Sequence, residues 1–358
     1  MENKTFPPHE WFEKLFGFKE DVSKIYDNIE CIEHDDAAVL RSKVNGKEYK
    51  AGNFQVRTVS SFKNLLDQPR NGGKLHLIKG DSHLSKHFEL IDVLQNQGLP
   101  ENDGASYLAA SNFNCLEFVS PYQTAHNGVT RYVYDGTQGP YCSLGSGPAI
   151  VYRNYFVKQP NGNVGQLETE IELLARTPFE VSHGYPLIYD TTAFESSNFD
   201  WSNPDNYPVG VHRNCQITTS QTKKGEFYLV EEGRIVHHIF AAAFNFVTTV
   251  RKNEFTLMVA KRLLSSEYRA AILAAWENSI LFPGRPGSNK LYLTLLGGGV
   301  FRNPFDLICG AIEENMDVIK ISGLDVYVVC FSTSIFEEVN SFLGKCVEET
   351  AGSIIDAN

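Results

Sequence analysis

The sequence lacks any paired cysteine motif. Its seven cysteines are scattered along the 358 residues, their number is odd, and none forms a C-x-x-C pair. A disulfide framework and a structural zinc site both need paired, regularly spaced cysteines, so both are excluded. Unpaired cysteines fit a reducing compartment, and we therefore expect a cytoplasmic protein.

Long apolar runs are also missing. No run approaches the ~20 apolar residues that cross a bilayer. The first residues, MENKTFPPHEWFEKLFGF, have no cationic flank followed by an apolar core. We therefore expect neither a secretory signal nor a membrane partner.

Basic residues are in deficit. Lys and Arg number 32 against 43 Asp and Glu, and the formal net charge is −11. Nonspecific nucleic-acid binding needs a basic surface, so we expect no nucleic-acid partner. An acidic surface suits a cationic substrate or partner, or is simply that of a solvated protein.

What the chain does contain is an alternation of strand-like and helix-like segments after residue 73. Near-continuous apolar strands separated by helices predict a sheet that is covered on both faces. The expected fold class is α/β, a three-layer α/β/α architecture with a mixed sheet. Residues 1–73 are predicted to form an N-terminal helical cap, and residues 159–221 an irregular insertion or elaborated edge. The segments expected to be strands are 74–78, 105–111, 234–246, 291–296 and 326–332, and those expected to be helices are 84–98, 147–156, 254–276 and 334–343.

One apolar strand ends on three glycines, in LLGGGVFRNPF at residues 295–305. Ligands of α/β sheets bind beyond the carboxyl ends of strands, and glycine lets a backbone approach a phosphate closely. The loop is not a P-loop, because no Lys-Ser/Thr pair follows the glycines, and it does not match the Rossmann fingerprint. It therefore predicts a diphosphate cradle with Phe301 over a ribose or ring face, or else a tight turn without a ligand.

A second glycine-rich loop, DGTQGPYCSLGSGPAIVYRNY, also opens into a predicted helix. Two such loops would clamp one diphosphate from two sides. The four glycines of this loop are Gly136, Gly139, Gly145 and Gly147.

Four motifs, in chain order, resemble those of macrodomains. They are IKGDSHL, similar to the motif whose aspartate holds adenine; YLAASNFN, similar to the ribose-binding strand end; and GSGPAIVYR and GGGVFRNP, similar to the two phosphate loops. Within the superfamily, ASNFNCLEF, YDGTQGPYCS, YRNYF and VHHIFAAAFNF most resemble the MavL-like branch. That branch removes ADP-ribose from arginine and is allied to the poly(ADP-ribose) glycohydrolases.

The resemblance implies a macrodomain-like catalytic domain over residues 74–358 that hydrolyses mono-ADP-ribose from protein side chains. It implies ADP-ribose as ligand and product, no separate cofactor, no metal, and an ADP-ribosylated protein as partner, with ubiquitin as one candidate. The implied ADP-ribose-binding residues are Asp81, Asn112, Asn114, Gln138, Gly139, Ser143, Gly145, Gly147, Gly297, Gly298, Gly299, Val300, Phe301 and Asn303.

Two carboxylates, Glu117 and Asp135, lie in the stretch between the asparagine motif and the first phosphate loop. Cleavage at an anomeric carbon passes through an oxocarbenium-like transition state. A nearby carboxylate either stabilises the positive charge of that state or activates the attacking water. A guanidinium leaving group is held by carboxylates as well. We expect one residue to orient the ribose or water and the other to meet the arginine. The structural alternative is that Glu117 starts a helix and Asp135 forms an Asp-Gly turn.

Other polar residues are expected to have structural roles. His237 and His238 would face opposite ways along a buried strand, so a core position suits them better than metal ligation. Cys115 and Cys142 are expected to pack in the interior. Arg153 and Arg302 are predicted either to meet phosphate or to be solvated.

Two other functions compete with the hydrolase. A non-catalytic reader would keep the cradle while both carboxylates were structural. A hydrolase of poly(ADP-ribose) or of another nucleotide-sugar ester is disfavoured, because the branch that acts on the polymer has paired glutamates after its glycines. Here Glu313 and Glu314 follow one helix too late.

Overall fold

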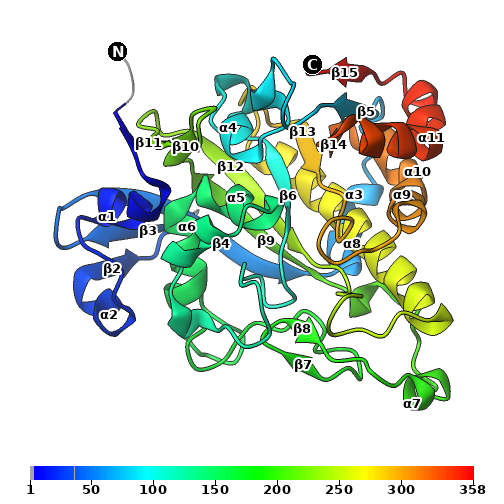
Figure 1. The fold of residues 1–358 in the computed structure, drawn as a ribbon, viewed down its shortest axis with the longest axis horizontal. Helices are drawn as coiled ribbons and strands as arrows, with labels where there is room; N and C mark the ends of the chain where they lie inside the picture. Colours follow the sequence, from blue (N-terminus) through cyan, green and yellow to red (C-terminus); the bar gives the residue numbers. More distant parts are fainter. Residues whose placement is uncertain (1–3, 36) are drawn as a thin grey trace.

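A ten-stranded mixed sheet forms the centre of the computed structural model, which describes residues 4–35 and 37–358 (Figure 1). Six neighbouring strands run parallel, and the remaining four continue the sheet in antiparallel order. This confirms the predicted mixed α/β class. The order across the sheet is β15 (Ile354–Asp356), β5 (Lys74–Lys79), β14 (Asp325–Cys330), β13 (Lys290–Leu293), β6 (Ser106–Ala110), β12 (Ile235–Ala241), β9 (Val209–Gln216), β4 (Glu48–Arg57), β3 (Ala38–Ser42) and β2 (Ile29–Ile32).

Helices cover both faces of the parallel strands. Every residue of β12 is buried, which requires a covering layer on each side. The long helix α8 (Glu254–Leu281) packs on β6, β9, β12 and β13, and α5 (Gln138–Leu144) and α6 (Gly147–Val151) lie on the opposite side of the sheet in Figure 1. Beside α8 lie α9 (Phe305–Glu313) and α10 (Met316–Ser322), and α11 (Thr333–Glu349) packs on α9, β5 and β14.

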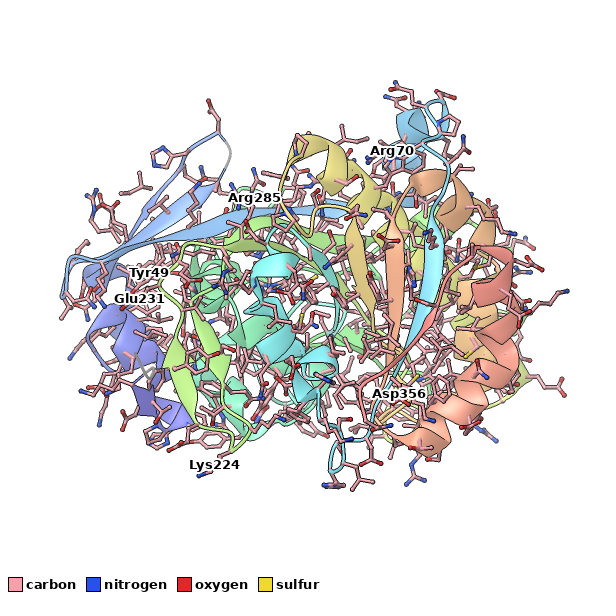
Figure 2. All side chains as sticks on the ribbon, turned by 90° about the horizontal axis from the view of Figure 1, so that it is seen from above. Tyr49, Arg70, Lys224, Glu231, Arg285 and Asp356 are labelled. Carbon is pink, nitrogen blue, oxygen red and sulfur yellow. The ribbon has the colours of Figure 1, made fainter. Side chains whose placement is uncertain are left out.

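The N-terminal segment is more than the helical cap that the sequence predicts. It holds α1 (Trp11–Phe16), α2 (Ile25–Asn28) and α3 (Lys63–Leu66), but β2, β3 and β4 extend the central sheet through the β4–β9 ladder. In Figure 2, Tyr49 of β4 and Asp356 of β15 lie toward opposite ends of the molecule. The strands escaped prediction because much of β4 is exposed and polar, so its apolar pattern is weak.

The prediction of an irregular segment at residues 159–221 is wrong at its C-terminal end. The segment contains the short hairpin of β7 (Val181–Ser182) and β8 (Tyr185–Pro186) and the helix α7 (Thr192–Glu195). It also contains β9, which pairs with both β12 and β4 inside the sheet. The sequence of β9, VGVHRNCQ, contains several polar residues, so it lacks the apolar pattern that predicts a buried strand.

The remaining elements are short. Of the helix predicted at residues 84–98, only two short pieces form, η4 (Phe88–Leu90) and α4 (Val93–Gln97). A small sheet joins β1 (Thr5–Phe6), β11 (Phe227–Leu229) and β10 (Thr219–Gln221). The single-turn helices are η1 (Pro8–Glu10), η2 (Val22–Lys24), η3 (Val59–Phe62), η5 (Pro100–Asn102), η6 (Ala125–Asn127), η7 (Thr130–Tyr134) and η9 (Pro204–Asn206), and η8 (Tyr152–Phe156) is a π-helix. Within the described ranges, no helix is both long enough and apolar enough to pass through a bilayer.

Candidate active site

A cavity of about 610 Å³ lies at the carboxyl ends of β6, β12, β13 and β14. Its walls come from the residues that directly follow these strands, together with the start of α5. This is the edge at which α/β sheets bind ligands. The predicted site residues that line the cavity are Asn112, Glu117, Asp135, Gln138, Gly297, Gly298, Gly299, Val300 and Phe301.

Glu117 is a buried carboxyl group at the wall of this cavity. The Ser143 hydroxyl donates to its Oε1 over 3.2 Å, and Nη2 of Arg153 lies 3.9 Å from the same oxygen. Burial raises the pKa of Glu117 to about 8, although Arg153 and Ser143 act in the opposite direction. Glu117 is therefore largely neutral at pH 7 and ionises just above it.

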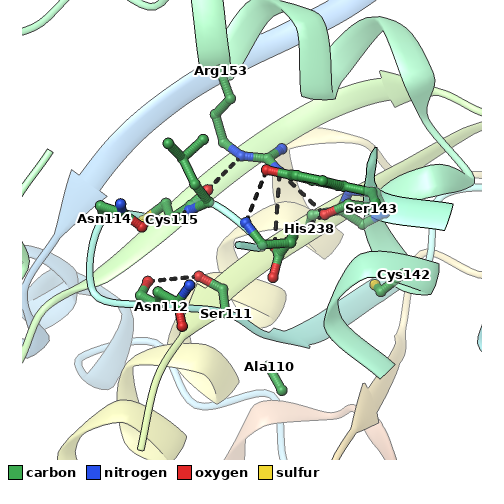
Figure 3. A network of polar contacts seen from close by, with 12 residues as sticks. Ala110, Ser111, Asn112, Asn114, Cys115, Cys142, Ser143, Arg153 and His238 are labelled. Atoms are coloured by element: carbon green, nitrogen blue, oxygen red, sulfur yellow. Dashed lines mark hydrogen bonds and ion pairs between the residues drawn. The ribbon is translucent and has the colours of Figure 1, made fainter. Parts of the chain in front are cut away.

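A fully buried cation, Arg153 of the π-helix η8, lies next to Glu117 on the side away from the cavity. Figure 3 shows Arg153 with its partners Cys115 and Ser143. Its Nε donates to the Cys115 carbonyl over 2.8 Å, and Nη2 donates to the Ser143 hydroxyl over 3.1 Å. The guanidinium also lies 3.9 Å from the centre of the Phe240 ring. Neither alternative predicted for Arg153, a phosphate contact or a solvated position, is correct. The apolar residues AIVY immediately before it were the available sign of burial.

Asp135 follows η7 and is half-buried at the cavity wall. Its Oδ1 accepts a hydrogen bond from the Thr137 backbone N–H over 2.9 Å, which is an Asx turn. The turn-forming role and the cavity-facing position therefore coexist. Its charge also raises the pKa of Glu117, so the two carboxyl groups interact electrostatically.

The three consecutive glycines have different local environments. Gly297 has φ +72°, and a Cβ there would lie 2.3 Å from Nδ2 of Asn303, which donates to the Phe244 carbonyl. Gly299 has no atom within 4 Å of the position that a Cβ would take, and it lines the cavity. The fold itself thus requires the first glycine, whereas the third leaves open space beside the cavity.

The second glycine loop brings α5 hard against the end of β6. A Cβ on Gly139 would lie 1.8 Å from the Ala110 carbonyl oxygen, so only glycine fits there. The Gln138 side chain accepts from the Ala110 N–H and donates to the Leu108 carbonyl. Its amide is therefore already engaged with β6, although the residue lines the cavity.

Several predicted ligand residues lie outside the cavity lining and contact protein groups instead. Asp81 caps a turn by accepting from the His83 and Leu84 N–H groups. Asn114 donates to Glu170 and accepts from the Leu116 N–H. The others outside the lining are Gly139, Ser143, Gly145, Gly147 and Asn303.

Gly145 and Gly147 serve packing rather than a second clamp. The Gly145 carbonyl accepts from two backbone N–H groups of the strand β10 region, and a Cβ on Gly147 would lie 2.6 Å from the Trp11 ring. Residues 135–138 instead line the same cavity as the glycines that follow β13. Apolar wall residues that the sequence did not single out are Phe118, Tyr185, Phe305 and Phe331.

His237 and His238 are fully buried, as predicted. Burial lowers the pKa of each to about 3, so both rings are neutral. His238 Nε2 lies 2.6 Å from Oε1 of Gln97. Cys115 and Cys142 are buried as well, and burial raises the pKa of both thiols. Among the residues with described coordinates, no three His, Cys, Asp or Glu side chains are grouped to hold a metal ion.

No protein-family model matches the chain, and no curated protein matches it in sequence. Solved structures of poly(ADP-ribose) glycohydrolases are similar to it. The Thermomonospora curvata enzyme shares 12% identity at a TM-score of 0.46, covering 94% of this chain and 98% of that chain. A Deinococcus radiodurans mutant in complex with ADP-ribose shares 14% identity at a TM-score of 0.43, covering 83% and 95%. The apo form of the enzyme from the same organism shares 15% identity at a TM-score of 0.42, covering 83% of this chain and 93% of that chain. Identities and TM-scores this low do not assign the chain to a family.

Proposed function

We propose that the protein is an ADP-ribosylhydrolase that removes mono-ADP-ribose from arginine side chains of modified proteins. The observation that carries this proposal is that two carboxyl groups of different burial face one cavity beside a glycine loop at the strand ends. The resemblance of the sequence motifs to those of macrodomains indicates ADP-ribose as the ligand. Residues 297–299 and 135–138 would hold its diphosphate, and Phe301 would cover a ribose or ring face.

In this proposal Glu117 acts on water. Its ionised form takes a proton from a water molecule as that water attacks the anomeric carbon of the distal ribose. The C–N bond to the guanidinium breaks, the guanidine leaves with the bond electrons, and the proton of the water ends on that guanidine. Arg153 supports the charged form of Glu117 from behind, at 3.9 Å.

Asp135 is the group that meets the arginine. It is the more exposed of the two carboxyl groups, and it belongs to a loop at the cavity wall. A guanidinium there also favours ionisation of Glu117, because a nearby cation stabilises the carboxylate form. Substrate binding and activation of the base are therefore coupled.

A poly(ADP-ribose) specificity has less support. Glu313 is the last residue of α9 and Glu314 is its C-cap, and both are exposed. They lie at the C-terminal end of α9, whereas the glycine loop precedes its N-terminal end. They do not line the cavity.

The test compares ADP-ribose release from arginine-linked and glutamate-linked substrates, without added metal. Glu117→Gln and Asp135→Asn are expected to reduce release from arginine by about 10²–10⁴-fold, the usual effect of removing acid–base groups. Glu172→Gln is the matched control. Burial raises the pKa of Glu172 to about 7, as it raises that of Glu117, but Glu172 does not line the cavity.

Calorimetry with free ADP-ribose separates the competing functions. Release from arginine that is lost in variants which still bind ADP-ribose supports the hydrolase. Binding without release from either substrate indicates a reader. If the wild-type protein neither binds ADP-ribose nor releases it, the proposal is wrong.

A further inference from the structure

Glu20, in the segment after α1, makes an unusual set of contacts with the centre of the chain. Its Oε1 accepts hydrogen bonds from the Val129 N–H over 2.8 Å and from the Tyr155 hydroxyl over 2.6 Å. Its Oε2 accepts from the Thr130 N–H over 2.7 Å and from the Thr130 hydroxyl over 2.6 Å. One carboxylate thus holds four donors that lie more than 100 residues further along the chain.

The turn that Glu20 holds leads to Asp135 and, through Tyr132, contacts the backbone of Glu117. It starts η7, and Asp135 is the C-cap of that short helix. The Tyr132 hydroxyl of η7 accepts the Glu117 backbone N–H over 2.9 Å. The Asp135 N–H in turn donates to the Tyr132 carbonyl. Displacement of η7 would therefore move Asp135 and loosen the backbone of Glu117 together.

A single-turn 3₁₀-helix has little stability of its own, because its hydrogen bonds are few and its first N–H groups lack intrahelical partners. A carboxylate that accepts from those N–H groups forms strong, charge-assisted bonds and complements the helix dipole. The backbone just before η7 is shaped for this carboxylate: Gly128 has φ +77°, and a Cβ there would lie 2.7 Å from Glu20 Oε2. Glycine is needed where the carboxylate sits.

We infer that Glu20 is a positioning residue that anchors η7 and thereby places Asp135 and Glu117 for the reaction. The catalytic part of this inference rests on the proposed function; the anchoring of η7 does not. The inference gives the N-terminal segment a direct part in building the active site, through one carboxylate rather than through general packing.

The test uses the full chain with Glu20→Gln, which keeps the shape of the side chain but removes its charge and one acceptor. Hydrogen exchange of residues 128–137 should become about tenfold faster or more, since hydrogen bonds to a charged acceptor are stronger than those to a neutral one. The kcat for release from arginine should fall about tenfold. ADP-ribose affinity should fall less, by about threefold or less, because the glycine loop at residues 297–299, the other part of the proposed diphosphate site, does not contact Glu20. Asp21→Asn is the matched control: it neutralises the neighbouring carboxylate, which caps η2 and does not contact η7.

Thr130→Val provides a second, milder variant if Glu20→Gln folds poorly, since it removes one of the four bonds and keeps the charge. It should give a smaller change in the same direction. Exchange at residues 128–137 that matches the wild type in both variants overturns the inference, whatever the activity. If the wild type releases no ADP-ribose but exchange is still faster in the variants than in the wild type, the anchoring of η7 is supported and only the proposed function is contradicted.

Discussion

At the scale of the residue, the ionisation of Glu117 depends on a cation that never meets solvent. Arg153 is buried, touches Ser143 and Cys115, and lies 3.9 Å from the carboxyl oxygen. Its charge lowers the pKa of Glu117, against the larger effect of burial, which raises it to about 8. Because the proposed base is active when ionised, kcat/KM should rise with pH through this value.

Arg153→Met removes the charge and should raise the pKa of Glu117 further. The rising limb of the kcat/KM profile should then move to higher pH, and activity at pH 7 should fall about tenfold for every pH unit that the limb moves. Arg153→Lys, which keeps the charge, should move the limb less. A profile measured from pH 6 to pH 10 that is unchanged in the Met variant would show that Arg153 does not tune Glu117.

The sequence predicts the positions of Glu117 and Asp135 at the cavity, and much less about what surrounds them. A motif fixes which residues follow a strand, and in an α/β sheet the ends of parallel strands converge. The partners of Arg153 come from a loop after β6 and from α5. These partners come together only in the tertiary structure, so the spacing of residues along the chain does not predict them. For the same reason, the sequence predicts Asn114 and Ser143 at the ligand, whereas the structure places both outside the cavity lining, in contact with Glu170 and Glu117.

At the scale of the element, the glycine loop after β13 combines a folding requirement with the binding role that we propose for it. Gly297 is fixed by its left-handed backbone and by contact with Asn303 and Ala243. Gly299 has empty space around it and lines the cavity. Alanine at Gly297 should therefore lower the stability of the fold, and alanine at Gly299 should lower the affinity for the ligand.

Gly297→Ala should destabilise the fold by about 1–3 kcal/mol, through the positive φ and the close contacts. Gly299→Ala should leave the free energy of unfolding within about 0.5 kcal/mol of the wild type and weaken ADP-ribose binding, because its methyl group occupies ligand space. Urea unfolding and calorimetry measure the two quantities. Wild-type affinity in Gly299→Ala would place the diphosphate elsewhere.

The elements that the sequence predicts well are those with strong apolar patterns. The parallel strands β5, β6 and β12 are buried on both faces, β14 is buried on one face and partly buried on the other, and the apolar runs of all four are nearly continuous. The antiparallel strands β4 and β9 carry polar residues that find partners only in the folded sheet, such as Arg213 with Asn278 and Glu277. Periodicity does not reveal such strands.

At the scale of the whole molecule, the sheet crosses the boundary predicted at residue 73. β4 pairs with β9 along five residue pairs, and Trp11 and Phe16 of α1 are fully buried. Residues 74–358 alone should therefore not form a stable domain, because the edge of β9 and the apolar surface under α1 would be exposed. Near-UV circular dichroism and urea unfolding of this fragment test the point. A cooperative transition at the midpoint of the full chain would instead make residues 1–73 a separable cap.

The pairing of β4 with β9 also sets an order of events during synthesis. β4 is complete when Arg57 leaves the ribosome, yet its partner begins only at Val209. At about 5–20 residues per second, the first three sheet strands wait roughly 8–30 s for the strand that joins them to the rest. During that interval an unpaired strand edge is open to any other nascent chain or chaperone. The protein is therefore expected to be more prone to aggregation during this interval of synthesis than after the sheet is complete.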